Sequence, residues 1–161
     1  MGGLSIAAMD LAPNARRGAE LTQLAFSWIV FTSGRRDPLN QARVMADNLA
    51  RDRTWMQVTY RPGPHLTVLQ DWLDANPDQR TAEQLGQGLY GLMLAMDPAL
   101  LRRLSRHFTG DAWDAQWPRT LGPAGNWVEN DPLGLEVRDF ILALPAELGL
   151  ERVLTKEGTL K

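Results

Sequence analysis

Two side chains within residues 105–114, His107 and Asp114, have the chemistry of metal ligands. The stretch reads SRHFTGDAWD and holds one of only two histidines in the chain, followed seven residues later by a carboxylate. A neutral imidazole nitrogen and a carboxylate oxygen are two of the three protein ligands that a catalytic zinc commonly uses, with the fourth position left open for water. The spacing therefore predicts part of a metal site.

Gly110 lies between these two residues, where a turn has to bring them back to one point. Glycine permits such a turn because it has no Cβ. Residues 111–117 alternate as in a short strand, which would place Ala112, Asp114 and Gln116 on one face and Trp113, Ala115 and Trp117 on the other. Asp114 would then point into a cleft.

The decapeptide fits the pattern SxHxxGxAxD and resembles the zinc D-alanyl-D-alanine peptidases. That family includes carboxypeptidases, dipeptidases and phage endolysins that cut the peptides of bacterial peptidoglycan. In the family the histidine and the aspartate of the motif bind zinc, so the resemblance implies that His107 and Asp114 are zinc ligands. Ser105, at the start of the motif, would contact the substrate.

A second stretch, residues 32–41, is similar to another motif of the same family. There a strand ends in T/S-S-G-Y-R, and a glutamine or asparagine follows after a short gap. Arg36 aligns with the family's arginine and Gln41 with its glutamine, whereas Arg35 replaces the usual tyrosine. The resemblance implies that Arg36 hydrogen-bonds the substrate carbonyl or carboxylate and that Gln41 helps to bind the substrate. A guanidinium suits this task because it is always charged and offers paired donors to an oxyanion.

Taken alone, Arg35 and Arg36 are typical of a solvated turn before a helix. Their order relative to the decapeptide motif favours the peptidase interpretation. His65 follows a Pro-Gly-Pro breaker at the start of an expected helix, where a lone histidine is more often a capping or surface residue than a metal ligand. We therefore leave His65 out of the predicted site.

The family's third zinc ligand is a histidine near the C-terminus, preceded by a Glu or Asp general base, and residues 115–161 contain no histidine. Glu157 is the candidate for the base, although it is also typical of a solvated turn. Three explanations stay open: the chain stops just short of a histidine-bearing strand, the domain is a degenerate relative, or another chain supplies the ligand. Two protein ligands alone would bind zinc weakly.

Composition narrows the classes of protein. The 161 residues are 44% apolar and 22% charged, which is ordinary for one globular domain. A net charge of −2 gives no general reason to bind nucleic acid or an anionic membrane, and the longest apolar run, residues 24–32, is too short to span a bilayer. Without cysteine, a metal must use nitrogen and oxygen donors. The N-terminal residues lack the pattern of a secretory signal, so we expect a protein of the producing cell's cytoplasm.

These observations predict an α+β fold in which a small antiparallel sheet bears a zinc site and packs against several helices, like that of the D-alanyl-D-alanine peptidases. Residues 1–12 would be a loose arm and residues 13–161 one metallopeptidase-like domain that lacks the final histidine-bearing strand. We expect helices over residues 13–25, 38–51, 66–75, 82–96, 98–104 and 132–148, and strands over residues 26–32, 111–117 and 150–155. Residues 52–64 would be a loop or a weakly extended segment, and residues 118–131 a loop.

The predicted function is zinc-dependent hydrolysis of peptide bonds in bacterial peptidoglycan, carried out on the cell wall after release or as part of a virion. The alternative is a catalytically incomplete relative that is a structural or wall-binding component of a phage particle or cell envelope, with virion proteins as partners. A third interpretation is a helical scaffold that matches both motifs by chance. The occurrence of the two motifs in the family's order disfavours it relative to the other two.

Overall fold

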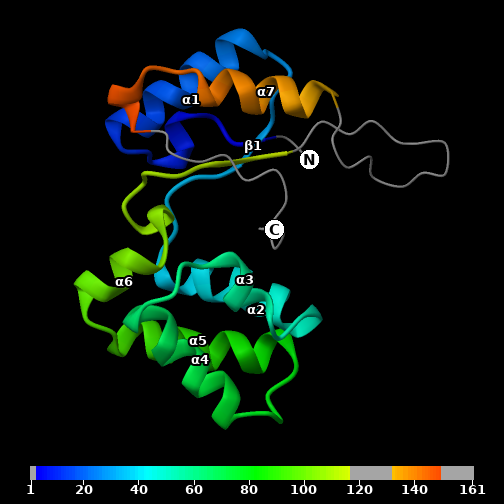
Figure 1. Ribbon diagram of the computed structural model, residues 1–161, viewed down its shortest axis with the longest axis vertical. Coiled ribbons are helices and arrows are strands. Elements are labelled where there is room, and N and C mark those ends of the chain that lie inside the picture. Colours follow the sequence, from blue (N-terminus) through cyan, green and yellow to red (C-terminus); the bar gives the residue numbers. More distant parts are fainter. Residues whose placement is uncertain (1–2, 117–131, 150–161) are drawn as a thin grey trace, which may run out of the picture. The chain divides into compact units, whose positions relative to one another are not determined.

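The computed structural model describes residues 3–116 and 132–149 (Figure 1). Contacts within the chain divide it into two compact units. Unit 1 consists of Met1–Arg35 and Thr109–Thr155, and unit 2 of Arg36–Phe108 and Lys156–Lys161. Unit 2 thus interrupts unit 1 in the sequence, and each unit has a hydrophobic core of its own. The single domain expected over residues 13–161 stays a prediction.

Unit 1 contains two short antiparallel strands, β1 (Phe31–Ser33) and β2 (Asp114–Ala115). Phe31 pairs with Ala115 and Ser33 with Asp114, with an irregular register between the two pairs. The helical elements of this unit are η1 (Ala7–Met9), α1 (Pro13–Ala25), α7 (Pro132–Leu142) and η3 (Ala146–Leu148). The start of α1 at Pro13 and of α7 at Pro132 agrees with the sequence pattern, since proline is favoured in the first helical turn.

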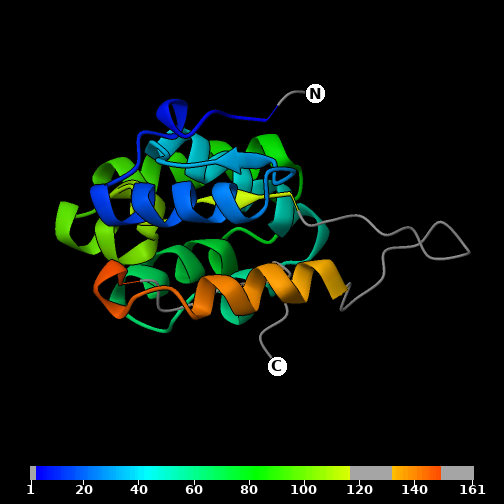
Figure 2. The ribbon, with the colours of Figure 1, turned by 90° about the horizontal axis from the view of Figure 1, so that it is seen from above.

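The core of unit 1 joins the two helices to the first strand. Helices α1 and α7 contact each other and lie side by side in Figure 2, where α1 is blue and α7 orange. Phe26 packs edge-on against Phe140 of α7, with ring centroids 5.3 Å apart. Phe31 of β1 packs in the same way against Trp113, at 5.1 Å. The strand pair is therefore anchored to the core through Phe31 and Trp113.

The prediction of a strand over residues 26–32 is wrong for residues 26–30. Phe26 caps the end of α1 by donating its backbone N–H to Thr22, and Ile29 donates to Phe26 in a turn, so only residues 31–33 form a strand. Phe26 and Ile29 are nevertheless buried. A short apolar run shows that a segment is buried without showing whether its backbone is extended, and here the burial is achieved by a turn.

The N-terminal residues also differ from the loose arm expected at 1–12. Met9 and Leu11 are buried in the core of unit 1, and the η1 turn precedes them. The strand expected at residues 111–117 is limited to Asp114–Ala115 within the described part of that stretch. Helix α7, expected to continue to about residue 148, ends at Leu142, because Pro145 lacks an N–H and restricts the residue before it.

Unit 2 is helical, with α2 (Pro38–Arg51), α3 (Trp55–Thr59), α4 (Pro64–Ala75), α5 (Ala82–Ala95), α6 (Pro98–Leu104) and the short turn η2 (Arg106–Phe108). The predicted starts of α2, α5 and α6 are confirmed by their caps. The Asp37 carboxylate accepts a hydrogen bond from the Asn40 N–H at 2.8 Å, and Asp97 caps α6 in the same way. Thr81 and Gln84 form a reciprocal capping box at α5.

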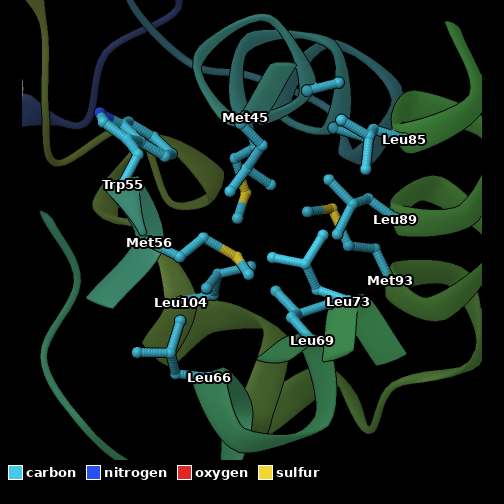
Figure 3. Close-up of a cluster of buried hydrophobic side chains, with 13 residues drawn as sticks. Met45, Trp55, Met56, Leu66, Leu69, Leu73, Leu85, Leu89, Met93 and Leu104 are labelled. Carbon is cyan, nitrogen blue, oxygen red and sulfur yellow. The ribbon is translucent and has the colours of Figure 1, made fainter. Parts of the chain in front are cut away.

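The core of unit 2 is built mainly by packing α2 against α5, with α3, α4 and α6 completing it. Methionine side chains fill its centre: Met45, Met56 and Met93 are fully buried and converge with leucines of α4 and α5 (Figure 3). Methionine is flexible enough to fill the irregular space between helices that cross in several directions. Unit 2 therefore has a continuous apolar interior without any strand among residues 36–108.

Helix α3 lies within residues 52–64, which the sequence pattern predicted as a loop. The Asp52 carboxylate accepts from the N–H and from the hydroxyl of Thr54, at 2.9 and 2.7 Å, and this local turn leads into the helix. Trp55 and Met56 then enter the core. The loop prediction is wrong because tertiary burial of these two side chains stabilises a helix too short to form alone.

In its coarse class the fold is α+β: the described residues form seven α-helices and one two-stranded antiparallel sheet. None of the helices within residues 3–116 and 132–149 is long and apolar enough to cross a membrane. The strand expected at 150–155 and the loop expected at 118–131 lie outside the described residues.

His65 is buried in unit 2, with 5% of its surface exposed, so the interpretation as a surface residue is wrong. It shares one face of α4 with the buried residues Leu69 and Leu73, four and eight positions later. Its Nδ1 is buried and has no hydrogen-bond partner among the described residues. Burial lowers the pKa of His65, the charge of Arg103 lowers it further, and a hydrogen bond with the backbone of Arg61 opposes both effects.

We expect the free energy of unfolding to depend on pH through His65. In the unfolded chain a histidine titrates at about pH 6.5, so below that pH the unfolded state binds the proton more readily than the folded state does. The contribution of neutral, buried His65 to the free energy of unfolding should therefore be complete above about pH 6.5. It should fall as the pH drops toward the lowered pKa of His65. Urea unfolding of the wild type and of His65→Gln, followed from about pH 8 to about pH 5, tests this.

The comparison concerns the slope with pH, because the substitution can also change stability at every pH alike. His65→Gln should show the shallower loss below about pH 6.5. Parallel curves for the two proteins would show that His65 does not titrate as described.

Candidate functional site

The structure distributes the predicted site residues between the two units. Arg36, Gln41, Ser105 and His107 belong to unit 2, whereas Asp114 belongs to unit 1. The candidate base, Glu157, lies outside the described residues.

In unit 2 the two motif stretches meet through a main-chain hydrogen bond. The N–H of Arg36 donates to the carbonyl of His107 at 3.0 Å. His107 lies in the η2 turn and is half-buried. Arg36, which is also half-buried, directly precedes Asp37, the cap of α2. Two residues far apart in the sequence are thus neighbours within unit 2.

Ser105 supports the turn that carries His107. The Ser105 hydroxyl accepts from the His107 N–H at 3.3 Å, and the Ser105 carbonyl accepts from the Phe108 N–H at 3.2 Å. Serine often accepts such bonds from the backbone that follows it. The structure therefore assigns Ser105 a local role in shaping the turn, and its contact with a substrate stays a prediction.

Gln41 contacts the Arg36 side chain from the first turn of α2. The Nη1 of Arg36 lies 3.5 Å from the Oε1 of Gln41, and the Nε2 of Gln41 donates to the Tyr60 hydroxyl at 2.9 Å. Gln41 is only 1% exposed. The partners shown for its amide are thus protein groups, and its direct contact with a substrate stays a prediction.

In unit 1, Asp114 is held by the strand pair. It lies opposite Ser33, the residue before the Gly34-Arg35-Arg36 sequence, and it is half-buried. The next residues continue the pairing, since the Gln116 N–H donates to the Val30 carbonyl at 2.7 Å. Because Trp113 packs into the core of unit 1, the neighbouring Asp114 side chain starts from the other face of the strand.

Gly110 adopts a backbone conformation that favours glycine, as predicted. Its φ is +77°, and a Cβ at this position would lie 2.9 Å from both the Arg35 guanidinium and the Asp10 carbonyl oxygen. The Gly110 carbonyl accepts from the Ala12 N–H at 3.0 Å. The turn in the decapeptide motif is therefore packed against the N-terminal segment of unit 1, which leaves no space for a side chain.

Arg35 takes the position of the family's tyrosine and has a structural partner. Its Nε lies 2.8 Å from the Asp10 carboxylate and 3.1 Å from the Asp10 carbonyl, while its own N–H donates to Met9. The ion pair is exposed, and pairs of this kind contribute about 0–1 kcal/mol to stability. Arg35 thus connects the end of β1 to residues 9–10.

The donor types of His107 and Asp114 fit zinc, but the number of donors does not. Among the described residues no group of three His, Cys, Asp or Glu side chains could hold a metal ion. His107 and Asp114 supply one nitrogen and one oxygen donor, from different units. Their joint coordination of zinc, the third ligand and the base at Glu157 all stay predictions.

Comparison with known proteins adds no relative: no family model, no curated protein and no solved structure matches the chain.

Tyr60 is a residue of this region that the sequence pattern did not single out. Its hydroxyl contacts Gln41, and its ring packs edge-on against Trp55 at 5.5 Å. Residues 52–64 were predicted as a loop, and no local pattern relates a tyrosine to a glutamine 19 positions earlier. Only the burial of Trp55 and Met56 in α3 brings the tyrosine to α2.

We expect Gly110→Ala to destabilise unit 1 by about 2–3 kcal/mol, because the new Cβ would both strain the positive φ and displace Arg35 and residues 10–12. Gly149→Ala is the matched control: Gly149 has φ +64° but no atom within 4 Å of an added Cβ, so only the strain of about 1 kcal/mol applies.

Urea unfolding measures the two losses, and hydrogen exchange at the Ala12 amide reports the contact itself, because its acceptor is the Gly110 carbonyl. Exchange at Ala12 should accelerate more in Gly110→Ala than in Gly149→Ala. Equal losses of stability and equal exchange in the two variants would show that the close packing around Gly110 is unimportant.

Proposed function

We propose that this chain is related to the zinc D-alanyl-D-alanine peptidases and shares their fold. In this proposal it hydrolyses peptide bonds in bacterial peptidoglycan. The observation that carries the proposal is the hydrogen bond between the Arg36 N–H and the His107 carbonyl. It joins the backbones of one residue from each of the two motif stretches. A chance match of short patterns gives no reason for these residues to meet.

In this proposal His107 and Asp114 are two of the zinc ligands. Zinc, when bound, supplies a Lewis acid and an activated water for hydrolysis. His107 would coordinate through its imidazole, whose backbone is held by the Ser105 turn and by Arg36. Asp114 would contribute a carboxylate oxygen from β2. The described residues do not supply the third ligand, and Glu157 is the candidate general base.

Arg36 would bind the substrate peptide. A guanidinium can hold a terminal carboxylate through two parallel hydrogen bonds and can also stabilise an oxyanion that develops during hydrolysis. Gln41 would take part in the same binding region through its contact with Arg36. A peptide ending in a free carboxylate is thus the substrate class that the chemistry of these residues favours.

The second candidate function is that of a catalytically incomplete relative. The incomplete donor set favours it, since the described residues offer no three-ligand group and the only other histidine, His65, is buried in unit 2. Such a protein would bind the wall peptide through Arg36 without cutting it, as a structural or wall-binding component of a phage particle or cell envelope. Both candidates place the protein in the cytoplasm of the producing cell until its release or its assembly with virion proteins.

Zinc content and peptide hydrolysis together distinguish these candidates. The full chain would be dialysed against zinc, its metal content measured, and release of D-alanine from peptidoglycan fragments followed. If the enzyme proposal holds, His107→Ala and Asp114→Asn should lose bound zinc and lower hydrolysis by at least about 100-fold. Asp111→Asn is the matched control, because it removes an exposed carboxylate from the same motif.

Arg36→Ala should retain zinc but lose about 100-fold in kcat/KM, with Arg43→Ala on the exposed face of α2 as its control. Zinc content and hydrolysis that are unchanged in His107→Ala would refute the role of His107. Binding of wall peptide that depends on Arg36, without zinc and without hydrolysis, would establish the second candidate instead.

A further inference from the structure

Gln41 is a polar residue of α2 whose amide is enclosed within unit 2. Its two ends contact different groups: Oε1 faces the guanidinium of Arg36, and Nε2 donates to the hydroxyl of Tyr60 at 2.9 Å. A buried amide without partners would cost about 1–3 kcal/mol. Both contacts are therefore part of the reason that a glutamine can occupy this position in the core.

The charge of Arg36 decides which way the amide of Gln41 is oriented. A guanidinium has donors only, so it must face the amide oxygen, and the amide nitrogen must then face Tyr60. A tyrosine hydroxyl can accept that hydrogen bond. The contact between Arg36 and Gln41, at 3.5 Å, is long for a hydrogen bond. The amide oxygen of Gln41 thus favours one orientation of the Arg36 guanidinium but binds it only weakly.

Tyr60 is fixed in place by contacts that do not involve its hydroxyl. Its backbone N–H donates to the Met56 carbonyl at 3.0 Å, which ends α3. Its ring meets Trp55 at an interplanar angle of 83°, and it packs against the core of unit 2. The hydroxyl is therefore presented to α2 from a rigid support.

From these contacts we infer that Tyr60 is a positioning residue for Arg36 and acts through the amide of Gln41. The predicted effect on substrate binding rests on the proposed function, in which Arg36 binds the peptide carboxylate. The orientation of Arg36 by Tyr60 and Gln41 is independent of that function. A long, flexible arginine loses conformational entropy when it is fixed on a ligand. A side chain that is already oriented loses less on binding, which increases affinity.

Tyr60→Phe is the direct test, because it keeps the ring contacts with Trp55 and removes only the hydroxyl. Tyr90→Phe is the matched control: Tyr90 is the only other tyrosine, lies on α5, and also packs against the core of unit 2. Thermal unfolding of each variant shows whether the fold is retained.

The first readout needs neither zinc nor turnover. The Nε–H signal of Arg36 in a nitrogen-15 spectrum is assigned as the one absent from Arg36→Lys. In Tyr60→Phe this signal should shift and exchange faster with water, and in Tyr90→Phe it should not change. An Arg36 signal identical in the wild type and in Tyr60→Phe would overturn the inference.

Gln41→Glu provides a second, independent arm. A carboxylate at position 41 would attract the guanidinium without needing the hydroxyl to orient it, so adding Tyr60→Phe to Gln41→Glu should leave the Arg36 signal where Gln41→Glu alone places it. A shift in the double variant as large as that in Tyr60→Phe would show that Tyr60 acts on Arg36 by another route, against the inference.

The second readout is binding of N-acetyl-D-alanyl-D-alanine, measured by calorimetry. Tyr60→Phe should weaken binding about tenfold, whereas in an Arg36→Ala background it should cause no further loss. A general structural role for Tyr60 would weaken binding equally in both backgrounds and would overturn the inference. If the wild type binds no peptide while the Arg36 signal still responds to Tyr60→Phe, the proposed function fails and the positioning of Arg36 by Tyr60 stands.

Discussion

The hydrogen bond from the Arg36 N–H to the His107 carbonyl joins the first residue of unit 2 to nearly its last described one. Bringing the ends of a long chain segment together costs entropy. Burial of the methionine and leucine side chains between α2, α4 and α5 offsets that cost. Closure of unit 2 therefore depends on its apolar core, and it places Arg36 beside the turn that carries His107.

In unit 1, the pairing of β1 with β2 fixes where Ser33 of the first motif and Asp114 of the second lie. The chain leaves unit 1 just after β1 and returns to it just before β2, and these strands pair antiparallel. Ser33 of the first motif is therefore opposite Asp114 of the second. Gly110 makes this return possible, because its turn packs against residues 10–12 where a side chain would clash. The positions of the motif residues thus follow from how the chain enters and leaves each unit.

The candidate site has two chemical parts, a cation and a set of metal donors. In the proposed function Arg36 is the cation that binds a carboxylate, and its guanidinium contacts the buried amide of Gln41, which in turn donates to the Tyr60 hydroxyl. The metal side has one nitrogen and one oxygen donor of suitable type, and the described residues do not complete the set. Binding of an anionic peptide needs only the first group, whereas hydrolysis needs both. This difference separates the enzyme from the binding protein as candidate functions.

The amino-acid sequence by itself determined the features that depend on neighbours within about four residues, such as the caps of α2, α5 and α6 and the turn at Gly110. It also singled out Arg36 and His107 as candidate site residues, and only the tertiary structure brought their backbones together. Only the tertiary structure decided that residues 26–30 turn, that α3 forms, that His65 is buried and that Tyr60 meets Gln41. These outcomes depend on which distant surfaces pack together, and local patterns do not encode that choice because the partners lie far apart in the chain.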